Sequence, residues 1–257
     1  PTLNPSQGHT AAAVLPNGKI VVASDFVSGN QAIEVLQLNP DGTADGSYGY
    51  YGLATISLPM TDFLVDSMVA QPDGKIVLAG RDHSQTQGLV TVRLTASGQL
   101  DSSYDFDGVA VSDVGGIVSA DRILLDNSGR ILVAGYAYGT ESNSLLARLT
   151  PTGTLDNTFA GTGFVVDTYG QDSSRLTALT LRANGNIVVS GATYSVAEGK
   201  SLLAAQYVPD GTLDPNFGNA GTMRVSINAY YQGPSGVESV VLDTISELAS
   251  GELLLTS

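Results

Sequence analysis

Residues Gln71 to Gly80, with the sequence QPDGKIVLAG, combine a tight turn with the start of a buried strand. Pro-Asp-Gly-Lys is a hairpin turn, because its glycine can adopt the positive φ that such a turn requires. The apolar, β-branched run that follows is typical of an interior strand. The same pattern recurs along the chain, with turn glycines at Gly18, Gly74, Gly129, Gly185 and, in a weaker form, Gly251. These glycines are 56, 55, 56 and 66 residues apart.

A second landmark keeps the same period. In the segment Leu100 to Tyr104, LDSSY, an aromatic residue follows an aspartate by three positions, and a glycine follows four residues later. The equivalent aspartates are Asp45, Asp101, Asp156 and Asp214, and the glycines are Gly52, Gly108, Gly163 and Gly221. Two landmarks with one period identify tandem repeats. The repeats run roughly over 8–59, 60–115, 116–170, 171–228 and, in part, 229–257.

Each repeat is predicted to contain four short strands. In the second repeat these are Leu64 to Ala70, Ile76 to Gly80, Leu89 to Leu94 and Gly108 to Val114. No segment has sustained helical periodicity, so helix content near zero is expected. Four strands per repeat indicate an all-β fold, a β-propeller of four-stranded antiparallel blades. We predict a single propeller domain over 1–257, with four full blades and half of a fifth.

The landmarks also resemble a known repeat family. The run QPDGKIVLAG, followed by Val92-Arg93-Leu94, Leu100-Asp101 and Gly108, is similar to the bacterial delta-60 repeat. That repeat occurs in tandem in exported proteins and is thought to form propeller blades. The resemblance covers nearly the whole chain, with departures at Ala44, where leucine is usual, and at the Glu252 turn. It implies the fold and an extracellular or periplasmic location, and it implies little about activity.

Composition narrows the classes of partner. The chain has 257 residues, a formal net charge of −14 and no cysteine. This acidity disfavours nucleic acid and anionic membrane surfaces, because both carry negative charge. The lack of cysteine excludes disulfides and thiolate chemistry. No apolar run is long enough for a membrane-spanning helix, so no membrane insertion is expected. We expect no cofactor, with a structural Ca²⁺ as the open alternative.

The repeated residues are predicted to be structural. The aspartate of the second landmark caps its loop, and the aromatic ring that follows is wedged between blades. Arg93 and Arg148 occupy one column of the repeat, which Gln37 and Gln206 fill elsewhere, and we expect this column to bond to the nearby aspartate.

The loops that do not repeat lie on the opposite face of the blades and carry the candidate binding residues. Tyrosines together with Asp, Asn and Arg suit a sugar, because a ring stacks on pyranose C–H groups while polar groups bind the hydroxyls. The alternative is that these are ordinary solvated loops. Arg175 is expected in a loop between blades on this face. The candidate ligand-binding residues are Asp25, Phe26, Arg81, Asp82, His83, Tyr136, Tyr138, Tyr194, Tyr230 and Tyr231.

The two histidines, His9 and His83, are weak candidates for a metal or acid–base site with Asp25 or Asp82, although their spacing matches no ligand signature. The alternative is two unrelated surface imidazoles. No catalytic motif is present in the sequence. Our first hypothesis is a non-catalytic exported scaffold that binds glycan or protein. The second is a secreted hydrolase of polysaccharides or esters, with carboxylates or histidine at the ring centre.

The fifth repeat has only its first two strands in this sequence, the second being Leu253 to Ser257. An open ring would leave unpaired strand edges, which proteins avoid. We therefore expect a further segment of the same chain, or a second copy, to complete the ring.

Overall fold

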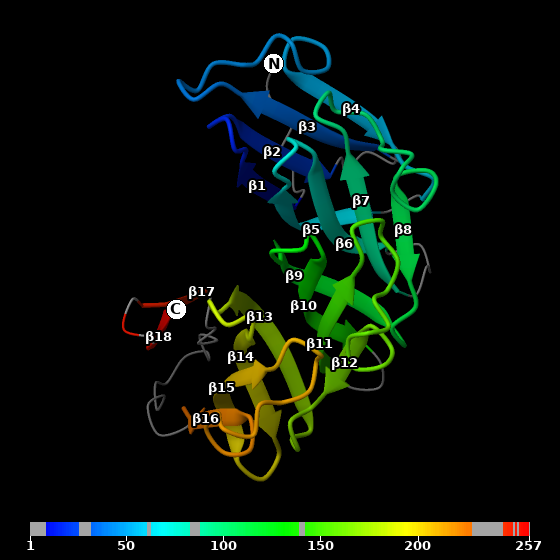
Figure 1. Ribbon diagram of the computed structural model, residues 1–257. Coiled ribbons are helices and arrows are strands. Elements are labelled where there is room, and N and C mark those ends of the chain that lie inside the picture. The colour runs from blue at the N-terminus through cyan, green and yellow to red at the C-terminus, as the bar shows by residue number, and fades with distance from the viewer. Residues whose placement is uncertain are drawn as a thin grey trace, which may run out of the picture. The chain divides into compact units, whose positions relative to one another are not determined.

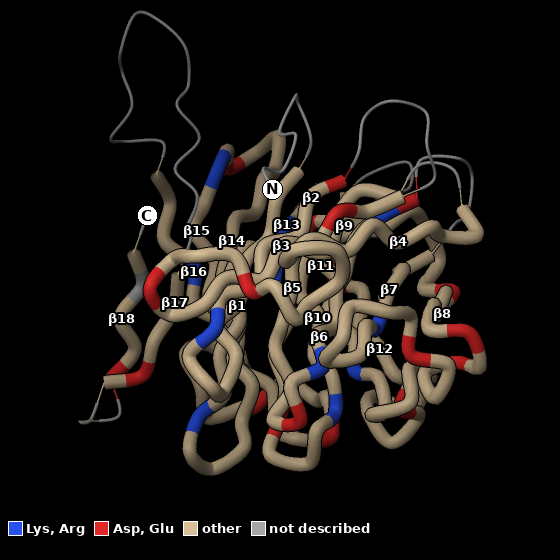
Figure 2. Tube along the Cα trace, turned by 90° about the horizontal axis from the view of Figure 1, so that it is seen from above, with Lys and Arg blue, Asp and Glu red and all other residues tan. Residues whose placement is uncertain are grey.

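The computed structural model describes residues 9–25, 32–60, 63–82, 88–138, 142–227, 244–248, 250 and 252–256. The described part contains strands and turns and no helix (Figure 1). Charged residues lie mostly in the turns and at the strand ends (Figure 2). This distribution leaves the interiors of the strands free to bury apolar side chains.

The strands form four four-stranded sheets and one two-stranded sheet. In every sheet the strands follow one another in sequence order, as in a meander, and the paired strands run antiparallel. The first sheet contains β1 (Thr10–Val14), β2 (Ile20–Asp25), β3 (Ala32–Leu38) and β4 (Leu53–Ser57). The second contains β5 (Phe63–Ala70), β6 (Ile76–Asp82), β7 (Leu89–Leu94) and β8 (Val109–Ser112).

The other sheets repeat this arrangement. The third contains β9 (Ile117–Leu125), β10 (Ile131–Tyr138), β11 (Ser142–Leu149) and β12 (Phe164–Asp167). The fourth contains β13 (Ser173–Leu181), β14 (Ile187–Ser195), β15 (Gly199–Tyr207) and β16 (Thr222–Ser226). The two-stranded sheet contains β17 (Thr244–Glu247) and β18 (Leu253–Thr256).

The chain divides into two compact units, which are described separately. Unit 1 comprises Pro1–Ile131 and Leu149–Thr154, and unit 2 comprises Leu132–Arg148 and Leu155–Ser257. Within unit 1, β1 lies beside β5, and β5 lies beside β9. Within unit 2, β13 lies beside β17. The first strands of successive repeats are thus neighbours, as in consecutive propeller blades. The predicted fold class, four full blades and half of a fifth, is confirmed, while the single domain stays a prediction.

The strand boundaries differ from the predicted ones at the variable face. Residues expected in loops lie instead at strand ends, because the antiparallel pairing continues further than the apolar run. Asp82, for example, pairs with Phe63, and Tyr194 pairs with Ser173. Asp25, Arg81, Asp82, Tyr136, Tyr138 and Tyr194 all belong to strands. Arg175, expected in a loop between blades, lies within β13.

The final glycine of the QPDGKIVLAG run has a packing role. A Cβ atom on Gly80 would lie 1.9 Å from the carbonyl oxygen of Leu64, which no side chain can tolerate. The close approach coincides with a β-bulge in the facing strand, where the register shifts between Val65 and Ser67. Gly191 of the fourth sheet has the same relationship to the carbonyl of Arg175. The repeated glycine therefore permits a bulge in the first strand of the blade.

Buried apolar side chains fill the space between the first and second sheets of unit 1. All six residues of β7 are buried, and Val65 and Leu78 are fully enclosed in the same cluster. Each such side chain contributes about 1.5–3 kcal/mol when it is removed from water. The aromatic residue of the second landmark packs against the next repeat. A Cβ on Gly153 of the next repeat would lie 2.8 Å from the ring of the fully buried Tyr104.

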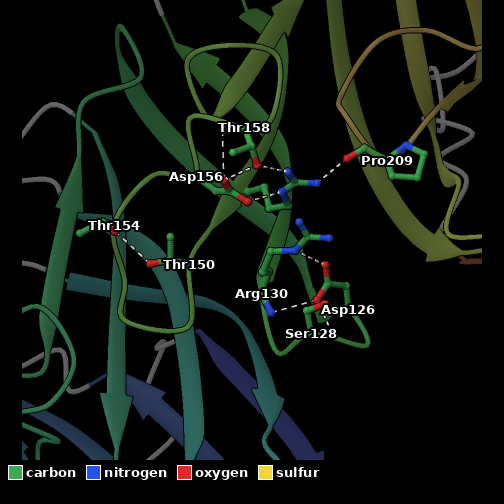
Figure 3. A network of polar contacts seen from close by, with 9 residues as sticks. Asp126, Ser128, Arg130, Thr150, Thr154, Asp156, Thr158 and Pro209 are labelled. Atoms are coloured by element: carbon green, nitrogen blue, oxygen red, sulfur yellow. Dashed lines mark hydrogen bonds and ion pairs between the residues drawn. The ribbon is translucent and has the colours of Figure 1, made fainter.

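The repeated aspartate caps its loop as predicted. Oδ1 of Asp101 accepts hydrogen bonds from the amide and the hydroxyl of Ser103, at 3.1 and 2.7 Å. Nε of Arg93 lies 2.8 Å from Oδ2 of the same carboxylate. In unit 2, Asp156 and Arg148 repeat this pair (Figure 3). The predictions that the aspartate caps a loop, that the ring is wedged between blades and that the Arg column bonds to the aspartate are confirmed.

Candidate functional site

The predicted binding residues that the structure describes fall into two groups. Asp25, Arg81 and Asp82 lie in unit 1, and so does His9. Tyr136, Tyr138 and Tyr194 lie in unit 2. The remaining candidates lie outside the described residues, and these are Phe26, His83, Tyr230 and Tyr231.

In unit 2, two tyrosines from one strand form a pair. Tyr136 and Tyr138 are two positions apart on β10, so their side chains leave the same face of the sheet. Their ring centroids are 4.7 Å apart with an interplanar angle of 65°, and their hydroxyl groups are hydrogen bonded to each other. Tyr136 is buried, whereas 43% of Tyr138 is exposed. The inner ring thus supports an outer ring that is open to solvent.

A cation fixes the inner ring. Cζ of Arg175 on β13 lies 4.5 Å from the centroid of the Tyr136 ring, which is a cation–π contact. Arg175 pairs with Ala192 on β14, and Tyr194 pairs with Ser173, so Arg175 and Tyr194 lie on the same face of the fourth sheet. Tyr194 is 44% exposed. We call Tyr136, Tyr138, Arg175 and Tyr194 the tyrosine patch.

In unit 1, the candidate residues gather around a carboxylate that the sequence analysis did not single out. Oδ1 of Asp66 on β5 lies 3.4 Å from Nδ1 of His9 and 3.5 Å from Nη1 of Arg81. Oδ2 of Asp66 accepts a hydrogen bond from the amide of Ala120 at 3.1 Å. Asp66 occupies the β-bulge of β5, and this position turns its side chain toward the neighbouring first strands.

Arg81 continues this network into the third sheet. Nη1 of Arg81 donates to Oγ of Ser119 at 2.9 Å, and that hydroxyl donates to Asp121 at 3.0 Å. Nε of Arg81 is buried, and none of the residues described nearby accepts a hydrogen bond from it. We call His9, Asp25, Asp66, Arg81 and Ser119 the rim cluster.

Asp25 is the most unusual member of the rim cluster. Its amide donates to the carbonyl of His9 at 3.3 Å, so the two residues face each other across β1 and β2. Asp25 is 4% exposed, and no side chain of the described residues donates a hydrogen bond to its carboxylate. Burial raises the pKa of Asp25 above its ordinary value, and the charge of Asp66 adds to this effect. The charge of His9 and hydrogen bonds from the amides of His9 and Asp25 oppose it.

A signal for Asp66 was present in the sequence. The strand FLVDSMVA of residues 63–70 carries one charged residue among apolar neighbours, and a buried charge within a strand is rare unless it is paired. Ser119 could not be found in this way, because serine is common in strands and loops alike.

The predicted metal site stays a prediction. His83 lies outside the described residues, and His9 contacts Asp66. Among the residues that the structure describes, no three His, Cys, Asp or Glu side chains are grouped so that they could hold a metal ion. The suggestion of a structural Ca²⁺ likewise remains untested.

The repeats match a family model in four places. Residues 15–48, 71–104, 127–159 and 182–217 fit the family described as a domain of unknown function (DUF5122) beta-propeller. The chain belongs to this family. The predicted membership of a tandem β-propeller repeat family is confirmed, since each match spans both landmarks of one repeat of this DUF5122 propeller. No curated protein matches the sequence.

Solved structures resemble the DUF5122 chain in fold. A protein of unknown function from Dyadobacter fermentans is 12% identical with a TM-score of 0.50, covering 96% of this chain and 74% of that one. The extracellular domain of BT4673 from B. thetaiotaomicron is 11% identical with a TM-score of 0.47, covering 95% of this chain. The chain spans only 25% of the length of that protein. These identities show the fold alone.

An enzyme is also among the similar structures. Endo-1,4-beta-xylanase from Bacteroides thetaiotaomicron is 10% identical with a TM-score of 0.46, covering 95% of this chain and 81% of that one.

The described residues include no helix with the length and apolar character needed to cross a bilayer.

Proposed function

We propose that this DUF5122 propeller is a non-catalytic, exported module that binds a glycan through the tyrosine patch of its variable face. Export to the extracellular space or periplasm is supported by the resemblance of its repeats to the delta-60 repeat of exported bacterial proteins. The patch is formed by strands of the third and fourth sheets, and binding residues are usually positioned by such a scaffold. It faces away from the repeated aspartate loops that hold the blades together.

The observation that carries this proposal is the half-exposed ring of Tyr138. Tyr136 packs against it at a centroid distance of 4.7 Å, and Arg175 holds Tyr136 from the other sheet. A sugar that stacks on Tyr138 therefore meets a ring whose orientation is already fixed, so little side-chain entropy is lost on binding. Arg175 and the tyrosine hydroxyls can hydrogen bond the sugar's hydroxyl groups.

The charge of the chain limits the class of glycan. With 25 acidic and 11 basic residues the protein repels polyanions (Figure 2). We therefore favour a neutral polysaccharide over a sulfated or uronate-rich one.

A glycan array tests the proposal. The protein is applied to immobilised neutral, acidic and amino polysaccharides and to a carbohydrate-free protein surface. We expect retention on at least one neutral polysaccharide and none on the acidic ones. Retention on the protein surface alone would indicate a protein ligand in place of a glycan. Retention on no polysaccharide and not on the protein surface would contradict the proposal.

One observation favours the hydrolase alternative. Asp25 is a buried carboxyl whose pKa is raised, and it lies close enough to Asp66 for their charges to interact. Carboxyl pairs in different environments serve as acid and base in glycoside hydrolysis. Release of reducing sugar from the polysaccharide that the protein binds would support this second candidate.

A further inference from the structure

One face of the fourth sheet is covered over its first two strands, which we call the inner half of the blade. Ile245 of β17 packs with Ala178 of β13 and Val188 of β14, and Leu253 of β18 packs against the same cluster. The two-stranded sheet therefore lies on the inner half of the fourth blade, as the next blade does in a propeller.

The same face continues over β15 and β16, the outer half of the blade. Val188 pairs with Gln206 on β15. Ala204, two positions away on that strand, pairs with Met223 on β16. Met223 and Val225 therefore leave the sheet on the face that carries Val188. Met223 is 45% exposed and Val225 is 51% exposed, so this half of the face is open among the described residues.

The equivalent side chains of the first sheet are buried. Ala54 and Ile56 of β4 occupy the positions that Met223 and Val225 occupy in β16. Ala54 is 7% exposed and Ile56 is 5% exposed. The buried cluster that encloses them includes four residues from the outer half of the next blade, namely Val90, Val92, Leu94 and Val109. The outer half of a following blade is thus what covers this face.

The aromatic ring of the fourth repeat is less enclosed than its equivalents. In the first three repeats the ring is buried beneath a glycine of the next repeat, in the turn between that repeat's third and fourth strands. A Cβ on this glycine would lie 2.6, 2.8 and 2.9 Å from the ring in the pairs Gly98 with Tyr48, Gly153 with Tyr104, and Gly211 with Phe159. Phe217, the ring of the fourth repeat, is only partly buried. It is therefore shaped to receive one more glycine turn.

The edge of β18 offers backbone groups to the same partner. In each four-stranded sheet the second strand pairs with the first and the third strands. β18 holds the second position of its sheet, and among the described residues it pairs with β17 alone. An unpaired edge is a template for an added strand. The edge, the face and the ring all fit one segment, which is a third strand, a glycine turn and a fourth strand.

We propose that unit 2 binds the outer half of a blade of this same repeat, whose third strand pairs with β18 and whose glycine turn lies over Phe217. Its apolar side chains cover Met223 and Val225. We assign the segment to a further repeat of the same polypeptide. Every outer half that the structure describes already pairs with its own inner half, so a second copy has none to donate. The inference goes beyond the proposed function and uses no residue of the tyrosine patch.

Amide NMR on the whole chain, titrated with a synthetic peptide of residues 88–112, tests the inference. This peptide is the outer half of the second blade. We expect saturable shifts of the amide signals of Phe217 and Leu254. Val225→Asp should weaken the binding about tenfold, because it places a charge on the buried face. Val111→Asp is the matched control, since Val111 is 44% exposed on the outer strand of the second sheet, and it should leave binding unchanged.

A second peptide tests the glycine turn. The same peptide with Gly98→Val should bind about tenfold more weakly, because the new side chain would meet the ring of Phe217. Absence of saturable shifts in unit 2 with the natural peptide would overturn the inference, and so would equal binding by wild type and Val225→Asp. If sedimentation instead shows a dimer that Val225→Asp dissociates, a second copy covers the face and the inference is wrong. The glycan array decides the proposed function independently of these outcomes.

Discussion

Nε of Arg148 lies 2.8 Å from Oδ2 of Asp156, and both residues are buried in unit 2. The same guanidinium donates to Oγ1 of Thr158 at 2.9 Å and to the carbonyl of Pro209 in the next repeat (Figure 3). Its Cζ also lies 4.7 Å from the centroid of the Phe159 ring. One arginine therefore holds the capping aspartate, the ring and the following repeat together.

Glutamine fills the arginine position in the first and fourth repeats. In both repeats a second side chain also donates a hydrogen bond to the aspartate. Gln37 donates to Asp45 at 3.0 Å, and Nζ of Lys19 lies 2.6 Å from the same oxygen. Asp214 accepts from Gln206 at 2.7 Å and from Asn186 at 3.1 Å. The aspartate thus keeps at least two side-chain donors whichever residue fills the column.

Arg148→Met should lower the free energy of unfolding by about 3 kcal/mol, because it leaves the carboxylate of Asp156 buried without its cation. Arg148→Gln should cost only about 1 kcal/mol, because glutamine can keep the bond to Asp156, as Gln206 does for Asp214. Urea unfolding of both variants at pH 7 measures the difference. Equal losses would show that the charge of Arg148 contributes nothing beyond one hydrogen bond.

Gly153→Ala should lower the free energy of unfolding by about 3 kcal/mol for two reasons. The new Cβ would lie 2.8 Å from the buried ring of Tyr104, and the alanine backbone would have to keep the positive φ of 98°. Gly115→Ala is the matched control. It has a φ of 84° with nothing within 4 Å of the new Cβ, so it should cost about 1 kcal/mol. Thermal or urea unfolding of the two variants measures both losses, and their difference is the contribution of the ring's packing against the next repeat. Equal losses of unfolding free energy would contradict this packing role.

Asp25→Asn should make the protein more stable than wild type at pH 7 and equally stable at pH 3. Burial raises the pKa of Asp25 above 3.8, so the folded state binds this proton more tightly than the unfolded chain does. The free energy of unfolding therefore falls as the pH rises from 3.8 through the folded pKa. Unfolding of both proteins across this range provides the measurement. A less stable variant at pH 7 would mean that the ionised carboxylate has a stabilising partner.

The repeats specify the blades because two landmarks recur with one period, and this is why the strands of the second repeat could be located to within a few residues. The site was harder to predict. Tyr136 and Tyr138 could be named as candidate binding residues, but their pairing depends on β10 continuing beyond its apolar run. Asp66 was missed because a β-bulge, which no period in the sequence reveals, decides where its side chain points. Contacts between residues far apart in the sequence, such as His9 with Asp66, depend on how successive blades pack.

The central claim is that the exposed ring of Tyr138 stacks on a sugar. Calorimetric titration with the neutral polysaccharide that the array identifies tests it most directly, using wild type, Tyr138→Ala, Tyr138→Phe and Tyr50→Ala. Tyr50 is also an exposed ring, at 79%, but it belongs to a turn between β3 and β4, outside the patch. We predict about tenfold weaker binding for Tyr138→Ala, which corresponds to about 1.4 kcal/mol. Tyr138→Phe keeps the ring but lacks the hydroxyl and should lose less, and Tyr50→Ala should bind as wild type does. Unchanged binding by Tyr138→Ala, or a loss confined to Tyr50→Ala, would contradict the account.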